Sequence, residues 1–344
     1  MQIPDRQYVD RLVAEQGIVA AGNRLGVAAL IYTYRCTLAC RHCGFSCSPE
    51  RPSTHMTAEQ VVRNLRLLHE TGRVIHAAGG ECMMFWDDFR RAVGAARNEG
   101  VSPHFVETNC SFAVGDEIVR TRLRELRDLG VGGILASSDP FHQEFVSPEN
   151  FLRVRRIGGE VFGPRNVWCS DAPEARIRDL PAIARDAARL REYVLQSRIL
   201  MVGTAHRDLE PFLPEFPLDR LPLEAGWQKR YATRECMTDF ARDTMWEFHV
   251  DPYDNIMSNC GAILGRIGRT TPREVLDKGP ENAGEIASLL ARQGPFGLAR
   301  MAQERHGYAP PQRARTKCGF CFEVRKFLRP HYPEMLGPAE VYGE

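Results

Sequence analysis

Short apolar runs alternate with longer amphipathic segments between residues 26 and 205. The runs have the length of single buried strands and occupy residues 27–34, 74–80, 103–109, 132–139, 166–171 and 198–205. Between them apolar residues recur at helical spacing, most clearly at 57–72 and 116–130, each of which ends in a glycine. Alternating strands and helices predict a parallel sheet covered by helices. We therefore expect an α/β fold, in the form of a partial (β/α)6 TIM-like barrel, although a doubly wound sheet would give the same pattern.

The pattern changes after residue 205. Four prolines at positions 211, 214, 217 and 222 rule out a regular helix or a central strand there, which indicates a connector. Residues 246–260 then predict two short strands around an Asp-Pro-Tyr-Asp-Asn turn. We expect four parts along the chain: a helical N-terminal segment at 1–25, the partial barrel at 26–205, the connector at 206–232, and a small cysteine-rich α+β domain at 233–344.

Composition and charge narrow the class of protein. Of the 344 residues, 43% are hydrophobic and 26% are charged, as in an ordinary globular protein. The 45 basic and 44 acidic residues leave a net charge of +1, which argues against binding nucleic acid or a membrane surface by bulk charge. The N-terminus has no apolar targeting segment, and we expect a cytoplasmic protein with reduced thiols. Eleven cysteines then point to metal or redox chemistry.

The strongest chemical signal is a CxxxCxxC spacing two residues after the first predicted strand. It comprises Cys36, Cys40 and Cys43. Three thiolates on one loop can bind three irons of a [4Fe–4S] cube and leave the fourth iron open to a substrate or cofactor. A structural zinc site would need a fourth ligand, which Cys47 or His42 could supply. The spacing favours the cluster.

With the motifs at the later strand ends, this spacing resembles the radical SAM superfamily, whose open iron binds S-adenosylmethionine (SAM). Gly79-Gly80-Glu81 matches the family's GGE motif after the second strand, and further matches follow the third, fourth and sixth predicted strands. The resemblance implies that SAM is bound by Gly79, Gly80, Glu81, Asn109, Ser137, Asp139 and Gly203. The sequence departs from the family at His42, where an aromatic residue is frequent, at Cys82, where proline is common, and at Cys110, where glycine is frequent.

Four further cysteines lie in the last third of the chain. Cys236 and Cys260 flank the predicted strand pair, and Cys318 and Cys321 form a CxxC. Four thiolates can complete one iron–sulfur cluster or one zinc site. The set resembles the SPASM or twitch extension of radical SAM enzymes, which implies an auxiliary second [4Fe–4S] cluster. The match is partial, because Asn255 replaces the expected hairpin glycine and the full CxxCxxxxxC run is absent.

Three residues near predicted strand ends are candidates for catalysis. Cys110 and Cys169 could each donate a hydrogen atom to a substrate radical, although a cysteine without a disulfide is more often a small buried apolar residue. His142 follows the fourth strand and could contact substrate or transfer a proton; a loop-capping role fits its position equally well.

The resemblance implies an enzyme that reductively cleaves SAM to a 5′-deoxyadenosyl radical, which abstracts hydrogen from a substrate carbon, most often in oxidoreductase-type chemistry. Its first substrate class is a peptide side chain in a ribosomally made natural product, modified by cross-link, thioether or epimer formation. The alternative is a dehydrogenase, decarboxylase or epimerase of a small-molecule sugar or amino acid. A flavodoxin or ferredoxin is the implied electron donor. A non-catalytic, zinc-stabilised binding protein would explain the cysteines but not the motifs at successive strand ends.

Overall fold

A computed structural model describes residues 3–197, 199–221 and 233–344. The chain divides into two compact units, each built from three segments. The first unit comprises Met1–Leu38, Ser48–Asp186 and Trp246–Asp254, and the second comprises Ala39–Cys47, Ala187–Met245 and Asn255–Glu344. Each unit is described by itself below.

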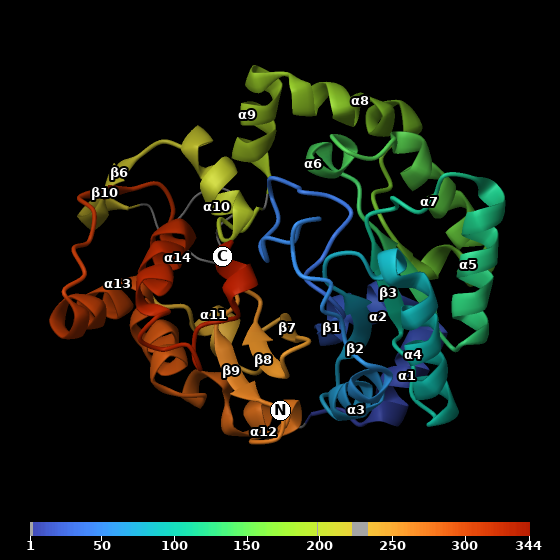
Figure 1. Cartoon of the computed structure of the whole chain (residues 1–344), viewed down its shortest axis with the longest axis horizontal. Helices are drawn as coiled ribbons and strands as arrows, with labels where there is room; N and C mark the ends of the chain where they lie inside the picture. The colour runs from blue at the N-terminus through green and yellow to red at the C-terminus, as the bar shows by residue number, and fades with distance from the viewer. Residues whose placement is uncertain (1–2, 198, 222–232) are drawn as a thin grey trace. The chain divides into compact units, whose positions relative to one another are not determined.

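The first unit is a parallel sheet with helices between its strands (Figure 1). Its strands are β1 (Val27–Ile31), β2 (Val74–Ala78), β3 (Phe105–Thr108), β4 (Gly133–Ala136), β5 (Val167–Trp168) and β7 (Glu247–Val250). They are all parallel, in the order β5-β4-β3-β2-β1-β7. Its helices are α1 (Arg6–Gln16), α2 (Ile18–Leu25), α3 (Ala58–His69), η1 (Cys82–Phe85), α4 (Trp86–Asn98), α5 (Asp116–Asp128), α6 (Pro140–Gln143), α7 (Pro148–Phe162), η2 (Pro164–Asn166) and α8 (Glu174–Arg185). The predicted α/β fold class is confirmed, and the barrel is open.

Strand register separates two faces of this sheet. Ala29 lies opposite His76 on β2 and opposite His249 on β7, so these three side chains share one face, which we call the inner face. At the start of the strands, this face is covered by apolar residues of α1 and α2, which pack on Val27, Val74 and Phe105. Helices α3 and α7 pack against the other face. The carboxyl ends of the strands are therefore left for the site.

The predicted sixth strand at 198–205 is wrong. Its described residues, 199–205, form no strand, and α10 (Thr204–Asp208) begins within the range. Gly203 has a φ of +59°, which ends the extended chain before that helix. The sixth parallel strand is instead β7, which pairs with β1. A short apolar run identifies a buried segment, and Met201 and Val202 are buried, but it does not by itself identify a strand.

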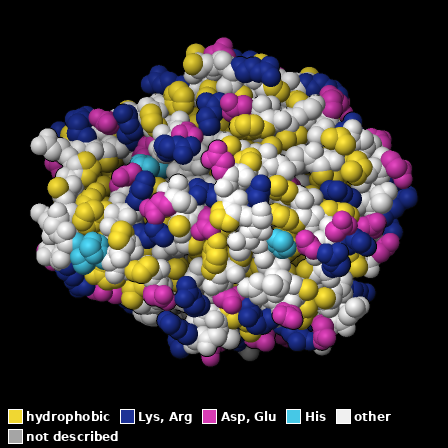
Figure 2. Space-filling model, in the orientation of Figure 1, with side chains coloured by type: hydrophobic (Ala, Val, Ile, Leu, Met, Phe, Trp, Pro, Cys, Tyr) yellow, Lys and Arg dark blue, Asp and Glu magenta, His cyan; other side chains and the backbone are white. Residues whose placement is uncertain are grey.

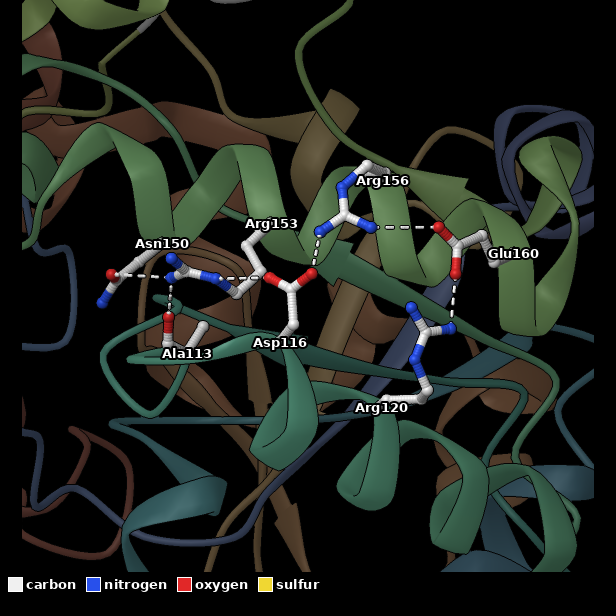
Figure 3. Close-up of polar contacts among 7 residues, drawn as sticks. All are labelled: Ala113, Asp116, Arg120, Asn150, Arg153, Arg156 and Glu160. Carbon is white, nitrogen blue, oxygen red and sulfur yellow. Dashed lines mark hydrogen bonds and ion pairs between the residues drawn. The ribbon is translucent and has the colours of Figure 1, made fainter.

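Ion pairs join α5 to α7 on the outside of the first unit (Figure 3). Asp116 of α5 accepts from Arg153 at 3.0 Å and from Arg156 at 2.5 Å. Glu160 of α7 accepts from Arg156 at 3.1 Å and from Arg120 of α5 at 2.5 Å. These pairs are largely exposed and individually weak, but they form a continuous network between the two helices.

The second unit contains an antiparallel pair, β8 (Asn255–Ser258) and β9 (Ile263–Arg266), and a separate short pair, β6 (Phe216–Pro217) and β10 (Arg313–Ala314). Its helices are α9 (Ala187–Gln196), α10, η3 (Glu210–Phe212), η4 (Leu218–Arg220), α11 (Met237–Phe240), α12 (Pro272–Lys278), η6 (Pro280–Asn282), α13 (Glu285–His306), α14 (Lys317–Leu328) and η7 (Ala339–Tyr342). Helix α13 is kinked at Gly294, which is followed by Pro295. Residues 222–232 of the predicted connector lie outside the described residues.

Basic and acidic side chains are interspersed on the face of the molecule shown in Figure 2. Within the described part of the chain, no helix combines the length and the apolar character needed to cross a membrane.

Candidate functional site

The sulfur of Cys36 receives two hydrogen bonds in the first unit. The Leu38 backbone N–H and the Asn109 side-chain amide each donate to Cys36 Sγ at 3.4 Å. The backbone N–H of Cys36 donates to the Ser48 carbonyl at 3.1 Å, which fixes the start of the cysteine loop. Hydrogen bonds of this kind stabilise a thiolate that ligates iron and influence its reduction potential. The surroundings of Cys36 therefore suit a metal-bound sulfur.

The two glycines after β2 allow a close backbone approach. Gly79 has a φ of +124°, and a Cβ there would stand 2.5 Å from the Thr33 carbonyl oxygen. A Cβ on Gly80 would stand 2.0 Å from the carbonyl oxygen of Arg35. The N–H groups of Gly80 and Glu81 donate to Thr33 and Arg35 at 2.7 and 3.2 Å. The GGE segment is thus fastened to the residues that lead into Cys36.

The Glu81 side chain is only 1% exposed and its carboxylate joins two strand ends. It accepts hydrogen bonds from the Thr108 hydroxyl at 3.1 Å, the Asn109 N–H at 2.8 Å and the Met83 N–H at 3.0 Å. Burial raises the pKa of Glu81 to about 7, and these hydrogen bonds oppose the rise. The carboxylate thus positions the ends of β2 and β3 relative to each other.

The loop after β3 is held from two sides. Asn109 Oδ1 accepts from the Ser111 N–H at 2.9 Å, which closes a local turn. The Asn150 amide of α7 donates to the Cys110 carbonyl at 3.2 Å, and Arg153 donates to the Ala113 carbonyl (Figure 3). Asn109 is therefore presented to Cys36 by a loop that α7 supports.

Two predicted residues after β4 contact each other. Asp139 caps α6 by accepting from the Phe141 and His142 N–H groups at 2.9 and 3.0 Å, and its other oxygen lies 2.7 Å from His142 Nδ1. The capping role considered for His142 therefore belongs to its partner, Asp139. The Ser137 N–H donates to the Thr108 carbonyl at 3.0 Å, so this residue also stands beside the end of β3.

The cysteines Cys40 and Cys43 belong to the second unit, where Gly203 packs against their loop. The Thr204 N–H donates to the Cys43 carbonyl at 2.9 Å, and the Cys47 N–H donates to Cys43 Sγ at 3.3 Å. A Cβ on Gly203 would stand 2.4 Å from the Gly44 carbonyl oxygen. The structure therefore shows why glycine is needed at position 203: it lets the chain before α10 approach the cysteine loop.

The two candidate hydrogen-atom donors are both thiols without a disulfide. Burial raises the pKa of Cys110 well above its usual value and also raises the pKa of Cys169. Both therefore keep their S–H hydrogen at neutral pH, as a hydrogen-atom donor must. Cys110 is fully buried, whereas Cys169 is partly exposed.

The four C-terminal cysteines line a single small pocket in the second unit. Cys318 and Cys321 lie in the first turn and a half of α14, which is capped by the Thr316 hydroxyl accepting from the Gly319 N–H at 2.9 Å. Burial raises the pKa of Cys236, Cys318 and Cys321, so a bound metal would have to displace their protons. The structure thus brings together all four cysteines of the predicted auxiliary set.

Two buried cations line the same pocket, and the sequence reasoning missed both. Arg325 is 0% exposed, donates through Nη1 to the Cys260 carbonyl at 2.8 Å, and also interacts with the Cys321 sulfur. Lys317 donates to the carbonyls of Thr233 and Glu235 at 2.7 and 3.1 Å. Burying positive charge costs several kcal/mol unless an anion lies nearby, so the pocket fits an anionic centre. The sequence did carry a signal for them, because Lys317 directly precedes the CxxC and Arg325 follows it by four residues.

The inner face of the first unit carries a group of histidines and glutamates that was also missed. Glu247 Oε1 lies 3.2 Å from His76 Nε2 and 3.4 Å from His249 Nε2, and Glu107 Oε2 lies 3.7 Å from His76 Nδ1. The sequence carried a signal for this group, because ionisable residues are rare in buried strands. They occur here in three strands, VIHAA, FVET and EFHV.

A second His–Asp group, Asp10 with His69 and His104, is structural. His104 Nδ1 accepts the Ile75 N–H at 2.8 Å, so Nε2 carries the proton and donates to Asp10 at 3.0 Å. A metal at Nε2 would require that proton to leave and give an imidazolate. The contact instead ties α1 to the segment before β3.

Comparison with known proteins agrees with the site. Residues 30–161, which span β1 to β4 and contain the CxxxCxxC and GGE motifs, match the Radical SAM superfamily. This segment is therefore similar to radical SAM domains. No curated protein sequence matches the chain.

Two solved structures are distantly similar. One is a crystal structure of BtrN in complex with AdoMet and 2-DOIA, at 14% identity and a TM-score of 0.43, covering 79% of this chain and 89% of that one. The other is Streptococcus suis SuiB bound to S-adenosylmethionine, at 12% identity and a TM-score of 0.30, covering 85% of this chain and 73% of that one. At these values neither likeness carries an inference about this chain.

We predict that Gly80→Ala destabilises the protein, because the added Cβ would force the GGE segment away from Arg35. The free energy of unfolding should fall by about 1–3 kcal/mol in denaturant titrations. The matched control is Gly159→Ala within α7, where no atom lies within 4 Å of the added Cβ. That variant should be neutral or up to about 1 kcal/mol more stable. Equal stability of the two variants would contradict the close approach.

A histidine between two carboxylates supports the helix that carries the CxxC. His206 Nε2 lies 2.5 Å from a Glu323 carboxylate oxygen, and Nδ1 pairs with Glu210, which in turn accepts from the Thr316 hydroxyl at 2.6 Å. Burial disfavours the imidazolium, but the two carboxylates outweigh it and raise the pKa of His206 to about 9.

We therefore predict a loss of stability in mild alkali. A histidine whose pKa is raised in the folded state contributes its full stabilisation below the unfolded pKa of about 6.5, and loses it as the pH rises through about 9. The contribution should be about 3 kcal/mol in unfolding titrations between pH 6 and 10. His206→Gln should be less stable than the wild type at pH 6, and it should not show this loss of about 3 kcal/mol between pH 6 and 10. Other groups that titrate in alkali are present in both proteins and affect both equally. If the free energies of unfolding of the two proteins changed with pH in parallel, the raised pKa of His206 would be contradicted.

Proposed function

We propose that this protein is a radical SAM enzyme in which Cys36, Cys40 and Cys43 hold a [4Fe–4S] cluster and SAM binds at the open iron. The observation that carries the proposal lies within the first unit. The segments after β2 and β3 are both hydrogen-bonded to the chain around Cys36, through Gly80 and Asn109. A binding protein that needed only a metal cross-link would not require the ends of three parallel strands to meet at one cysteine.

When bound, the reduced cluster supplies the electron that cleaves SAM to methionine and a 5′-deoxyadenosyl radical, which takes a hydrogen atom from a substrate carbon. The protein's own groups bind and orient. Asn109 holds the Cys36 sulfur, and Glu81 fixes the neighbouring strand ends. Asp139 orients the His142 ring, which could then accept or return a proton. Cys169, the more exposed of the two candidate thiols, keeps a hydrogen atom available.

We further propose a second [4Fe–4S] cluster at Cys236, Cys260, Cys318 and Cys321, as in a SPASM or twitch extension. Four thiolates on a [4Fe–4S]²⁺ core or on one zinc ion carry the same charge of 2−, so Arg325 and Lys317 suit either centre. The sulfur spacing favours the cluster. Sulfurs around one zinc lie about 3.8 Å apart, given a Zn–S distance of about 2.3 Å. Within the described part of the chain, the four sulfurs of these cysteines do not all lie within 4.8 Å of one another.

The substrate and the electron donor are proposed from the resemblance. A peptide side chain in a ribosomally made natural product comes first, and a small-molecule sugar or amino acid is the alternative. A flavodoxin or ferredoxin would deliver the electron. An auxiliary cluster could bind the substrate or accept an electron from the product radical, which would make the outcome oxidative.

We predict that changing Cys36, Cys40 and Cys43 together to Ala abolishes reductive SAM cleavage, because no iron would remain to bind SAM. The measurement is 5′-deoxyadenosine formed with dithionite after anaerobic reconstitution. Cys47→Ala is the matched control on the same loop. It should retain cleavage and iron, whereas a zinc site completed by Cys47 would lose its metal. Unchanged cleavage in the triple variant would refute the proposed function.

For the auxiliary site, we predict about eight irons per chain in the reconstituted protein and about four after Cys318→Ala with Cys321→Ala, since each cluster holds four irons. SAM binding should persist in that variant. Arg325→Met should also lower iron retention, because it removes the buried positive charge, while Lys326→Met on the exposed side of α14 should not. A content of about four irons and one zinc per chain in the wild type would instead indicate that the second centre is a structural zinc site.

A further inference from the structure

Arg325 lies on the face of α14 that carries the CxxC. Cys318, Cys321 and Arg325 are spaced i, i+3 and i+7 along the helix, which places all three side chains on one face. Long side chains of a helix lean towards its N-terminus, so the guanidinium group reaches back towards Cys321. The interaction between Arg325 and the Cys321 sulfur follows from this geometry.

The guanidinium group also reaches a second cysteine, which belongs to a different element. Its Nη1 donates to the Cys260 carbonyl, in the loop between β8 and β9, at 2.8 Å, and to the Tyr342 hydroxyl at 3.5 Å. Burial lowers the pKa of Arg325, but Tyr342, Cys260 and Cys321 outweigh it and hold this pKa above its usual value. The side chain therefore keeps its charge although it is 0% exposed.

The walls of the four-cysteine pocket make this charge effective. Water would screen the charge, but the described lining of the pocket includes the apolar residues Leu200, Val202, Phe240 and Leu290. A charge acts several times more strongly across such surroundings than it does across water. The Arg325 charge is thus held beside the cysteines in a place where little screens it.

Two other charged residues line the same pocket, and they oppose each other. Lys317 and Asp239 carry opposite charges and act with opposite signs on Cys236 and Cys318. Apart from the cysteines, the charges of the described lining therefore sum to that of Arg325 alone.

A fixed cation favours the reduced form of an iron–sulfur centre. Reduction adds one electron to a group that is already anionic, and no bond is formed or broken. The more negative state gains more from a nearby positive charge, so the reduction potential rises. Hydrogen bonds to the ligand sulfurs act in the same direction.

We propose that Arg325 raises the reduction potential of the auxiliary [4Fe–4S] cluster, through its charge and its contact with the Cys321 sulfur. The inference rests on the proposed function, which it deepens by assigning the residue that controls electron transfer at the second centre. Arg325 is not a ligand; it is a positioning residue that acts through Cys321 and Cys260. A raised potential suits a cluster that accepts an electron from the product radical.

The test is a redox titration, followed by electron paramagnetic resonance, of the reconstituted full-length chain. Every sample also carries Ala at Cys36, Cys40 and Cys43, so that only the second cluster gives a signal. Arg325→Gln should shift the equilibrium between the two forms about tenfold to a hundredfold towards the oxidised cluster. Each tenfold step lowers the one-electron potential by about 59 mV. Arg325→Lys, which keeps the positive charge, should recover most of the shift.

The matched control is Lys326→Gln, which removes a positive charge from the exposed side of α14. It should leave the potential unchanged, because water screens that charge. An unchanged potential in Arg325→Gln, or an equal decrease in Lys326→Gln, would overturn the proposal. A purely structural role of Arg325 would change the amount of iron bound but not the potential of the clusters that remain.

A second measurement keeps Arg325 in place and does not depend on how much iron Arg325→Gln retains. Arg325 is the arginine among the described residues that line the pocket. In protein labelled with ¹⁵N-arginine, the reduced second cluster should therefore show a ¹⁵N hyperfine coupling in electron–nuclear double resonance. Absence of this coupling would overturn the proposal, because no guanidinium nitrogen would then contact a ligand sulfur.

Failure of this inference is distinguishable from failure of the proposed function. If the wild type holds about eight irons and Arg325→Gln has an unchanged potential, only the role of Arg325 is wrong. If the four cysteines hold zinc, the auxiliary cluster and this inference are both wrong. Formation of 5′-deoxyadenosine tests the SAM chemistry independently of either result.

Discussion

The buried carboxylate of Glu81 accepts hydrogen bonds from the ends of β3 and η1, and the geometry of the first unit's candidate site depends on it. The backbone of the same residue donates to Arg35, just before Cys36. One residue thereby holds three chain segments that are far apart in sequence. A buried carboxylate with these partners satisfied is strongly directional, because every alternative arrangement leaves acceptors unpaired at a cost of about 1–3 kcal/mol each.

The second unit is governed by a different constraint, which is the presence of buried positive charge. Arg325 lies beside the rings of Phe322 and Tyr342, which stack on each other, and it lines the pocket of four cysteines. A buried guanidinium is stabilised by a neighbouring anion, and the four thiolates of the proposed metal centre would provide one. The His206–Glu210–Thr316 contacts hold the beginning of α14, so the CxxC and the cation are presented by one supported helix.

Much of the fold could be predicted because its strands are short and buried on both faces. The run VAALI is apolar throughout and VIHAA is apolar apart from His76, and the glycines and acids that follow such runs mark strand ends. The same reasoning failed at 198–205. That run is apolar because Leu200 and Val202 line the four-cysteine pocket, so its hydrophobicity reflects tertiary packing and not strand pairing. The strand that pairs with β1 comes from residues 247–250, and no local pattern identifies a partner so distant in sequence.

The sequence by itself determined the residue types and spacings that chemistry requires: three cysteines on one loop, GGE after a strand, and a CxxC with two further cysteines. These are local properties, encoded by spacing along the chain. Only the tertiary structure decided which side chains share a space. It brought His76, Glu107 and Glu247 together from three strands, and it placed Arg325 beside the four cysteines. Strand register and helix packing set such distances, and both depend on contacts between residues that are far apart in sequence.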